Sequence, residues 1–199
     1  TAISGARIEN QGIGDLETLS NYVPGVQIGR GSISTPVNIR GIGSGNNRGF
    51  EQSVGLYVDG VYLGRDRQFR APFLDLERVE VLRGPQSILF GKNTIAGAIS
   101  VISEGADPGG EFEAEGSVRW ESETNTTRYG GAIGVPVSDT FALRFAGQFE
   151  TGDGYISNRT RGIDEPGVEE WTLRGAAAWE PTDALSVNLR YSVSDSAVD

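Results

Sequence analysis

The sequence predicts a small α+β globular domain followed by about five antiparallel strands of a transmembrane β-barrel, too few to close it. Two patterns lead to this fold class. Short apolar segments interrupted by glycine fill the first half of the chain, and long runs of strict apolar–polar alternation fill the second half. A linker of turn-forming residues separates the halves. We therefore expect a globular domain at residues 1–103, the linker at 104–110 and barrel strands at 111–199.

The elements of the first half follow from caps, turns and alternation. Asp15 is placed to cap a short helix that ends at Pro24-Gly25. Residues 54–63 form a predicted hairpin with Asp59-Gly60 as its turn, and a second short helix is expected within residues 85–91. Further strands are expected at 26–28, 36–39, 76–82 and 96–102.

Five segments of the second half alternate over about ten residues, the length that a tilted strand needs to cross a bilayer. In one of them Phe141, Leu143 and Phe145 share a face. The five begin near Phe112, Tyr129, Phe141, Trp171 and Leu185. Short links are expected at 138–140 and 181–184, and longer polar links at 122–127 and 151–170. Such alternation of link lengths is typical of outer-membrane barrels, although a soluble β-sandwich has alternating strands too.

The composition argues against several function classes. The chain has no histidine and no cysteine, which removes the commonest metal ligand and general base and any thiolate chemistry. A net charge of −10 disfavours nucleic acid as a partner. The longest apolar stretch, at 95–102, is too short for a membrane helix. We expect no catalytic residues, no metal and no cofactor, and therefore no enzyme.

One segment identifies a family. Residues 76–103, which read LERVEVLRGPQSILFGKNTIAGAISVIS, resemble the plug domain of TonB-dependent receptors of the bacterial outer membrane. The segments at 22–26, 38–41 and 58–61 agree with that resemblance. It implies that residues 1–103 are a plug. The barrel of such receptors has about 22 strands, so this sequence is expected to be part of a longer protein.

The resemblance also implies a function. Receptors of this kind bind a scarce nutrient, such as a ferric siderophore, cobalamin, haem or an oligosaccharide, and import it with energy from the inner membrane. The expected partners are the small-molecule ligand, outer-membrane lipid, and TonB, which binds through an N-terminal segment that this sequence does not contain. A passive outer-membrane channel or an adhesin barrel is the alternative, but neither needs a globular plug.

Two sets of site residues follow from the resemblance. Arg40 and Arg83, in the motifs IRG and LRGP, are expected to pair with barrel glutamates and to hold the plug in place. The alternative is local pairing of these arginines with Glu77 or Glu80.

The second set lies in the loops at 29–32, 43–53 and 64–73, which correspond to plug apices that face the ligand. Their arginines would make a positive patch that suits an anionic ligand, and Phe69 would stack on a ring of that ligand. The alternative is that these side chains line a hydrated lumen. The candidates are Arg30, Asn46, Asn47, Arg48, Arg65, Arg67, Gln68, Phe69 and Arg70.

Overall fold

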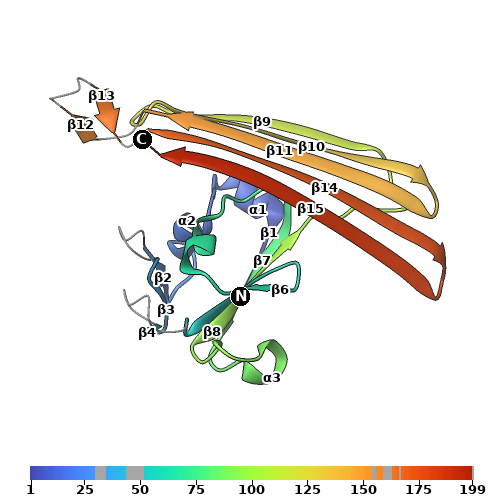
Figure 1. The fold of residues 1–199 in the computed structure, drawn as a ribbon, viewed down its shortest axis with the longest axis horizontal. Coiled ribbons are helices and arrows are strands. Elements are labelled where there is room, and N and C mark those ends of the chain that lie inside the picture. The colour runs from blue at the N-terminus through green and yellow to red at the C-terminus, as the bar shows by residue number, and fades with distance from the viewer. Residues whose placement is uncertain (30–34, 44–51, 154–155, 159–162, 166, 199) are drawn as a thin grey trace. The chain divides into compact units, whose positions relative to one another are not determined.

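The computed structural model describes the chain except for residues 30–34, 44–51, 154–155, 159–162, 166 and 199 (Figure 1). The chain divides into two compact units, Thr1–Glu104 and Gly105–Asp199. No helix among the described residues is long and apolar enough to cross a membrane. Each unit has its own sheets and is described separately.

The first unit contains a five-stranded mixed sheet in the order β1-β7-β8-β5-β6, in which only β5 and β8 are parallel. Its strands are β1 (Ala2–Ser4), β5 (Val54–Val58), β6 (Val61–Leu63), β7 (Leu76–Arg83) and β8 (Gly97–Ser103). A smaller antiparallel sheet holds β2 (Val26–Ile28), β3 (Val37–Ile39) and β4 (Ile42–Gly43). The helices are α1 (Gly5–Asn10), α2 (Leu16–Ser20), the 3₁₀ helix η1 (Asp66–Arg70) and α3 (Ser87–Phe90). This mixed unit matches the predicted α+β domain.

The central strands make the core of the first unit. Val79, Val81 and Ile99 are buried on β7 and β8, and side chains from α1, α2 and η1 pack into the same cluster. Almost every residue of β8 is buried, because this strand has neighbours on both edges and side chains packed against both faces. The apolar run at 96–102 is therefore a core strand, as predicted.

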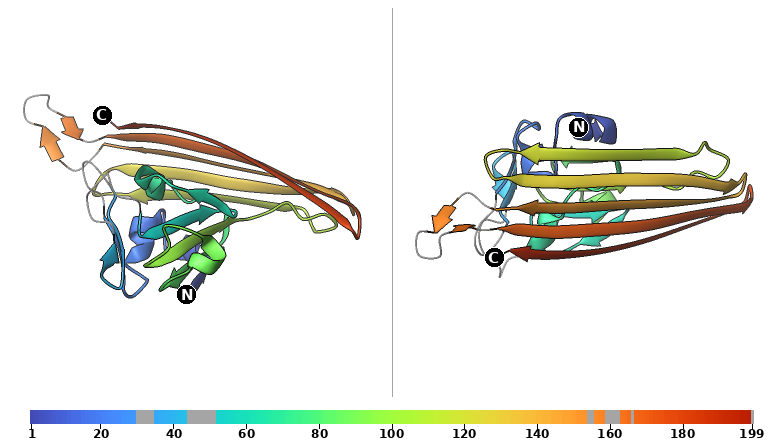
Figure 2. Two further views of the ribbon diagram at one scale, coloured as in Figure 1. Left: turned by 60° about the horizontal axis from the view of Figure 1, so that its bottom comes forward. Right: turned by 90° about the horizontal axis from the view of Figure 1, so that it is seen from above.

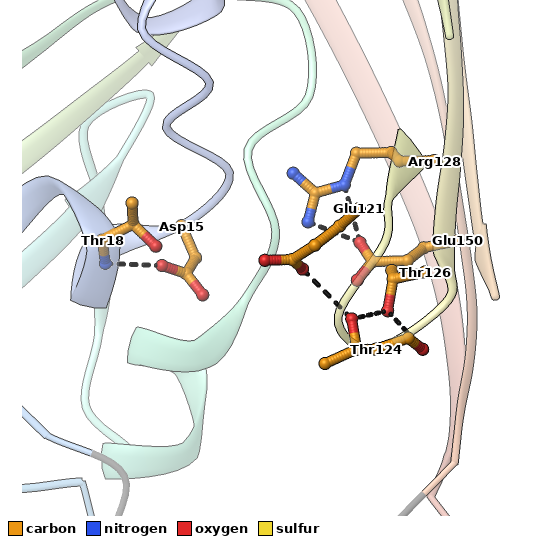
Figure 3. Close-up of polar contacts among 7 residues, drawn as sticks. All are labelled: Asp15, Thr18, Glu121, Thr124, Thr126, Arg128 and Glu150. Carbon is orange, nitrogen blue, oxygen red and sulfur yellow. Dashed lines mark hydrogen bonds and ion pairs between the residues drawn. The ribbon is translucent and has the colours of Figure 1, made fainter. Parts of the chain in front are cut away.

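Local signals place two elements as expected. The carboxylate of Asp15 accepts a hydrogen bond of 2.7 Å from the Thr18 amide and caps α2 (Figure 3). Asp59 and Gly60 both have positive φ in a two-residue turn between β5 and β6. Helix α2 ends at Ser20, earlier than the expected stop at Pro24-Gly25, because the chain turns through residues 21–25.

Strand β1 and helix α1 were not predicted. Their sequence is too short to show a period, and a tertiary contact fixes them instead. Ile3 is buried on β1, and Gly5 lies so close to the backbone of β7 that a Cβ there would collide with the Leu76 carbonyl oxygen. Only glycine permits this approach.

The second unit is an open antiparallel sheet in the order β15-β14-β11-β10-β9 (Figure 2). Its strands are β9 (Glu113–Glu121), β10 (Thr126–Ser138), β11 (Phe141–Gly152), β14 (Val168–Thr182) and β15 (Leu185–Val198). Phe145, Leu173 and Leu189 are 55%, 53% and 66% exposed. These side chains therefore do not lie in the closed core of a soluble sandwich, and the predicted barrel-type strands are confirmed.

The links between these strands differ in part from the prediction. Ser138 pairs with Phe141 and Thr182 with Leu185, so both short links are two-residue turns. Glu121 pairs with Thr126, which makes that link shorter than expected. The long link between β11 and β14 contains an additional hairpin of β12 (Ile156–Asn158) and β13 (Ile163–Glu165).

Candidate functional site

Arg83 ends strand β7, opposite Gly97 of β8. Its Nε atom is buried and has no hydrogen-bond partner among the residues that the structure describes. A buried guanidinium N–H without an acceptor carries a desolvation cost. Arg83 Nε is therefore a buried donor without an acceptor in the described part of the chain.

Arg40 occupies the tight turn between β3 and β4, where its φ is +53°. Its amide donates a hydrogen bond of 2.7 Å to the Gly25 carbonyl oxygen, and its side chain is exposed. The backbone of this residue is therefore held in place while its guanidinium faces outward.

Glu77 and Glu80 pair with Arg78, rather than with Arg40 or Arg83 as in the alternative drawn from the sequence. Arg78 Nε donates to Glu80 Oε1 at 2.7 Å, and Arg78 Nη1 contacts Glu77. The hydrogen bond to Glu80, followed by the negative charges of the two glutamates, raises the pKa of Arg78. Alternation along the strand places Arg78 and Glu80 on the same side. The sequence therefore contained a signal for this ion pair.

The 3₁₀ helix η1 carries four of the predicted apex residues. The side-chain oxygen of Gln68 accepts a hydrogen bond of 2.9 Å from the Arg65 amide. Arg70 Nε donates to Thr35 Oγ1 at 2.7 Å. Gln68 and Arg70 thus make contacts within the unit, and both Arg65 and Arg70 are exposed.

Phe69 does not lie where the prediction put it. Its side chain is only 1% exposed and belongs to the core of the first unit. The expectation that Phe69 stacks on a ligand is wrong for this structure, because its ring is already covered by core side chains. Sequence alone gave no warning, since a single aromatic residue between charged residues looks like a surface residue.

Several predicted apex residues lie outside the described residues: Arg30, Asn46, Asn47 and Arg48, together with the side chain of Arg67. The positive apex patch therefore stays a prediction. Among the described residues, no cluster of three or more acidic side chains is placed to hold a metal ion.

Ion pairs cross one face of the second unit. Arg128 and Glu150 lie directly opposite each other on β10 and β11, with Nε and Oε2 2.6 Å apart (Figure 3). Arg144 reaches from β11 to Glu113 on β9 at 2.8 Å, and its side chain is only 7% exposed. The sheet therefore has one charged, paired face and one apolar, exposed face, as strands of a barrel with a polar lumen require.

Residues 1–98 match the TonB-dependent receptor plug domain family. The chain belongs to the TonB-dependent receptors. Among curated proteins it resembles the pesticin receptor of Yersinia pestis, with 28% identity over 173 residues, 84% of this chain and 24% of that protein. It also resembles the ferrioxamine receptor of Yersinia enterocolitica, with 25% identity over 96% of this chain and 26% of that protein. The chain spans about a quarter of the length of these relatives.

Solved structures of TonB-dependent receptors share the fold. The ferric yersiniabactin uptake receptor FyuA from Yersinia pestis matches with a TM-score of 0.79 and 23% identity, over 98% of this chain and 31% of that one. FpvA of Pseudomonas aeruginosa, in a complex with a pyoverdine, matches with a TM-score of 0.82 and 13% identity, over 98% of this chain and 25% of that one. The chain is therefore part of a bacterial outer-membrane protein of the TonB-dependent receptor family.

Proposed function

We propose that this TonB-dependent receptor binds a ferric siderophore at the outer surface and imports it into the periplasm with energy delivered through TonB. Relatives that align with 94% and 96% of the chain are named for ferrioxamine B and ferrioxamine. A further relative from Vibrio cholerae is named an iron-regulated outer membrane virulence protein. These names support an iron-chelate ligand over cobalamin, haem or an oligosaccharide.

The buried Nε of Arg83, unpaired among the described residues, supports the gating part of this proposal. Strand β7 ends in the cationic side chain of Arg83, whose Nε is buried and has no acceptor in the described part of the chain. A carboxylate of the barrel would satisfy it with a charge-assisted hydrogen bond. Breaking such a buried pair on one side is costly, so the pair would hold the plug closed until force releases it.

Arg40 would act in the same way from a second point of the plug. Its guanidinium is exposed, and its main chain is fixed by the bond to Gly25. Arg40 lies in the turn between β3 and β4, and Arg83 lies on β7, which belongs to the other sheet of the same unit. Two such locks would resist rotation of the plug as well as displacement.

The ligand side of the proposal rests on the exposed Arg65 and on the predicted apex residues Arg30, Arg48 and Arg67. Positive charge gathered on an acidic chain attracts an anionic chelate and raises its association rate. This attraction is screened by salt. Binding of an anionic ferric siderophore should therefore weaken as ionic strength rises.

The test measures uptake of radiolabelled iron from a panel of ferric siderophores that includes anionic and cationic chelates, and uptake of cobalamin and haem. Cells carry the full-length receptor, with and without a functional TonB system. Uptake of an iron chelate that requires both the receptor and TonB supports the proposal. Uptake that continues without TonB supports a passive channel instead, and uptake of cobalamin or haem alone changes the ligand class.

A further inference from the structure

The 3₁₀ helix η1 is fixed by its own side chains. Phe69 is buried in the plug core, and Gln68 accepts a hydrogen bond from the Arg65 amide at 2.9 Å. Directly after η1, the Phe73 amide donates a hydrogen bond of 2.8 Å to the Gly14 carbonyl oxygen. These contacts hold η1 against the plug core and make it a support for neighbouring residues.

Arg70 connects this support to another part of the plug. Its Nε donates at 2.7 Å to Thr35 Oγ1, although 35 positions separate the two residues. Thr35 is only 2% exposed and lies at the end of the connection between β2 and β3. At the same base, the Gly29 amide donates to the Pro36 carbonyl oxygen at 3.1 Å.

The chemistry of this contact makes it a strong hydrogen bond. The donor is a charged guanidinium, and hydrogen bonds of charged groups contribute more than neutral ones. The acceptor hydroxyl is buried, so breaking the bond would leave it without water. The guanidinium can therefore pass a displacement of η1 to the base of the neighbouring connection.

We propose that Arg70 is a positioning residue, which couples η1 to the base of the β2–β3 connection at Gly29, Thr35 and Pro36, rather than a ligand contact. The importance of this coupling for ligand binding rests on the proposed receptor function. The coupling itself is a property of the plug and is measured without any ligand. A displacement of η1 is transmitted to Gly29 and Pro36 through the bond between Arg70 and Thr35.

The test measures hydrogen exchange in the full-length receptor. The exchange rate of the Gly29 amide reports on the base of the β2–β3 connection, and that of the Ala71 amide reports on η1. Thr35→Val removes the acceptor at nearly constant volume, and Thr35→Ser retains it. We expect Gly29 to exchange about tenfold faster in Thr35→Val and at the native rate in Thr35→Ser. Should Thr35→Val fail to fold, Arg70→Leu breaks the same bond from the donor side.

A second change measures transmission. Gln68→Ala removes the side-chain acceptor of the Arg65 amide and loosens η1. In the native background it should speed exchange at both Ala71 and Gly29, and in Thr35→Val at Ala71 alone. The proposal is overturned if Gly29 responds to Gln68→Ala equally in both backgrounds, or if Thr35→Ser behaves like Thr35→Val. A receptor that imports no iron chelate would contradict the proposed function and leave these rates unchanged.

Discussion

Arg144 Nη1 lies 2.8 Å from Glu113 Oε2, although strand β10 runs between the two strands that carry these residues. Gly134 of β10 lies between them in the register, opposite both. A Cβ at Gly134 would lie 3.2 Å from Arg144 Nη1, so the absence of a side chain gives the guanidinium its path. The charged face of the sheet therefore depends on a glycine as well as on its charges.

Gly134→Val should displace the Arg144 guanidinium and lower the free energy of unfolding by about 1 kcal/mol, the scale of one lost hydrogen bond. Glu113 is largely exposed, which limits the loss. Urea unfolding of the folded receptor, followed by tryptophan fluorescence, measures this change. Gly116→Val is the control, because the nearest heavy atom to a Cβ there is 3.9 Å away. Equal destabilisation by both variants would show that strand glycine, not the ion pair, sets the effect.

Arg83→Gln should make the outer membrane leakier, because the proposed lock between the plug and a barrel carboxylate loses its charge. Entry of a large hydrophilic antibiotic into cells that carry the variant measures the leak. Arg78→Gln is the matched control, since the Arg78 guanidinium already pairs with Glu77 and Glu80 on its own strand. If the control leaks as much as Arg83→Gln, Arg83 has no special role in closure.

Phe69→Ala should destabilise the plug by about 3–5 kcal/mol, the usual cost of removing a buried aromatic side chain. Hydrogen exchange of the β8 amides measures plug opening, and Leu89→Ala is the control because Leu89 is 80% exposed. A variant that binds ligand less well but keeps its full stability would restore Phe69 as a ligand contact.

Tyr57 should make plug stability depend on pH at the alkaline end. Burial, and to a smaller extent the neighbouring Tyr62, raise the pKa of Tyr57 above 10.0. The folded state therefore binds this proton more tightly than the unfolded state. The stabilisation is fully present below the unfolded pKa of about 10 and is lost as pH rises through the folded pKa.

The measurement is thermal unfolding followed by circular dichroism across the alkaline range, with phenolate absorbance recorded in parallel. Tyr57→Phe should remove part of the pH dependence. It also removes the hydrogen bond from the Tyr57 hydroxyl to the Phe90 carbonyl oxygen, so its stability at neutral pH is the baseline. Identical alkaline curves for both proteins would assign the dependence to other groups.

The site was predictable only in part. The motif around Arg83 was recognisable as a plug motif, but only the structure showed that its Nε is buried without a partner among the described residues. The alternation of β7 places Arg78 beside Glu80 and so contained a signal for that pair, but it places Glu77 on the other side and gave no signal for the contact with Glu77. The hydrogen bond between Arg70 and Thr35 had no sequence signal, because residues 35 positions apart meet only after η1 has packed into the core.

Local patterns in the sequence predict the two kinds of unit, the order of the barrel-type strands along the chain and their exposed face, because alternation and turn residues are local properties of the chain. The contacts of the buried side chains follow only from the fold. It buried Phe69, inserted β1 and α1 against β7, and brought Arg144 across Gly134 to Glu113. These outcomes depend on contacts between residues distant in sequence, which no local pattern records.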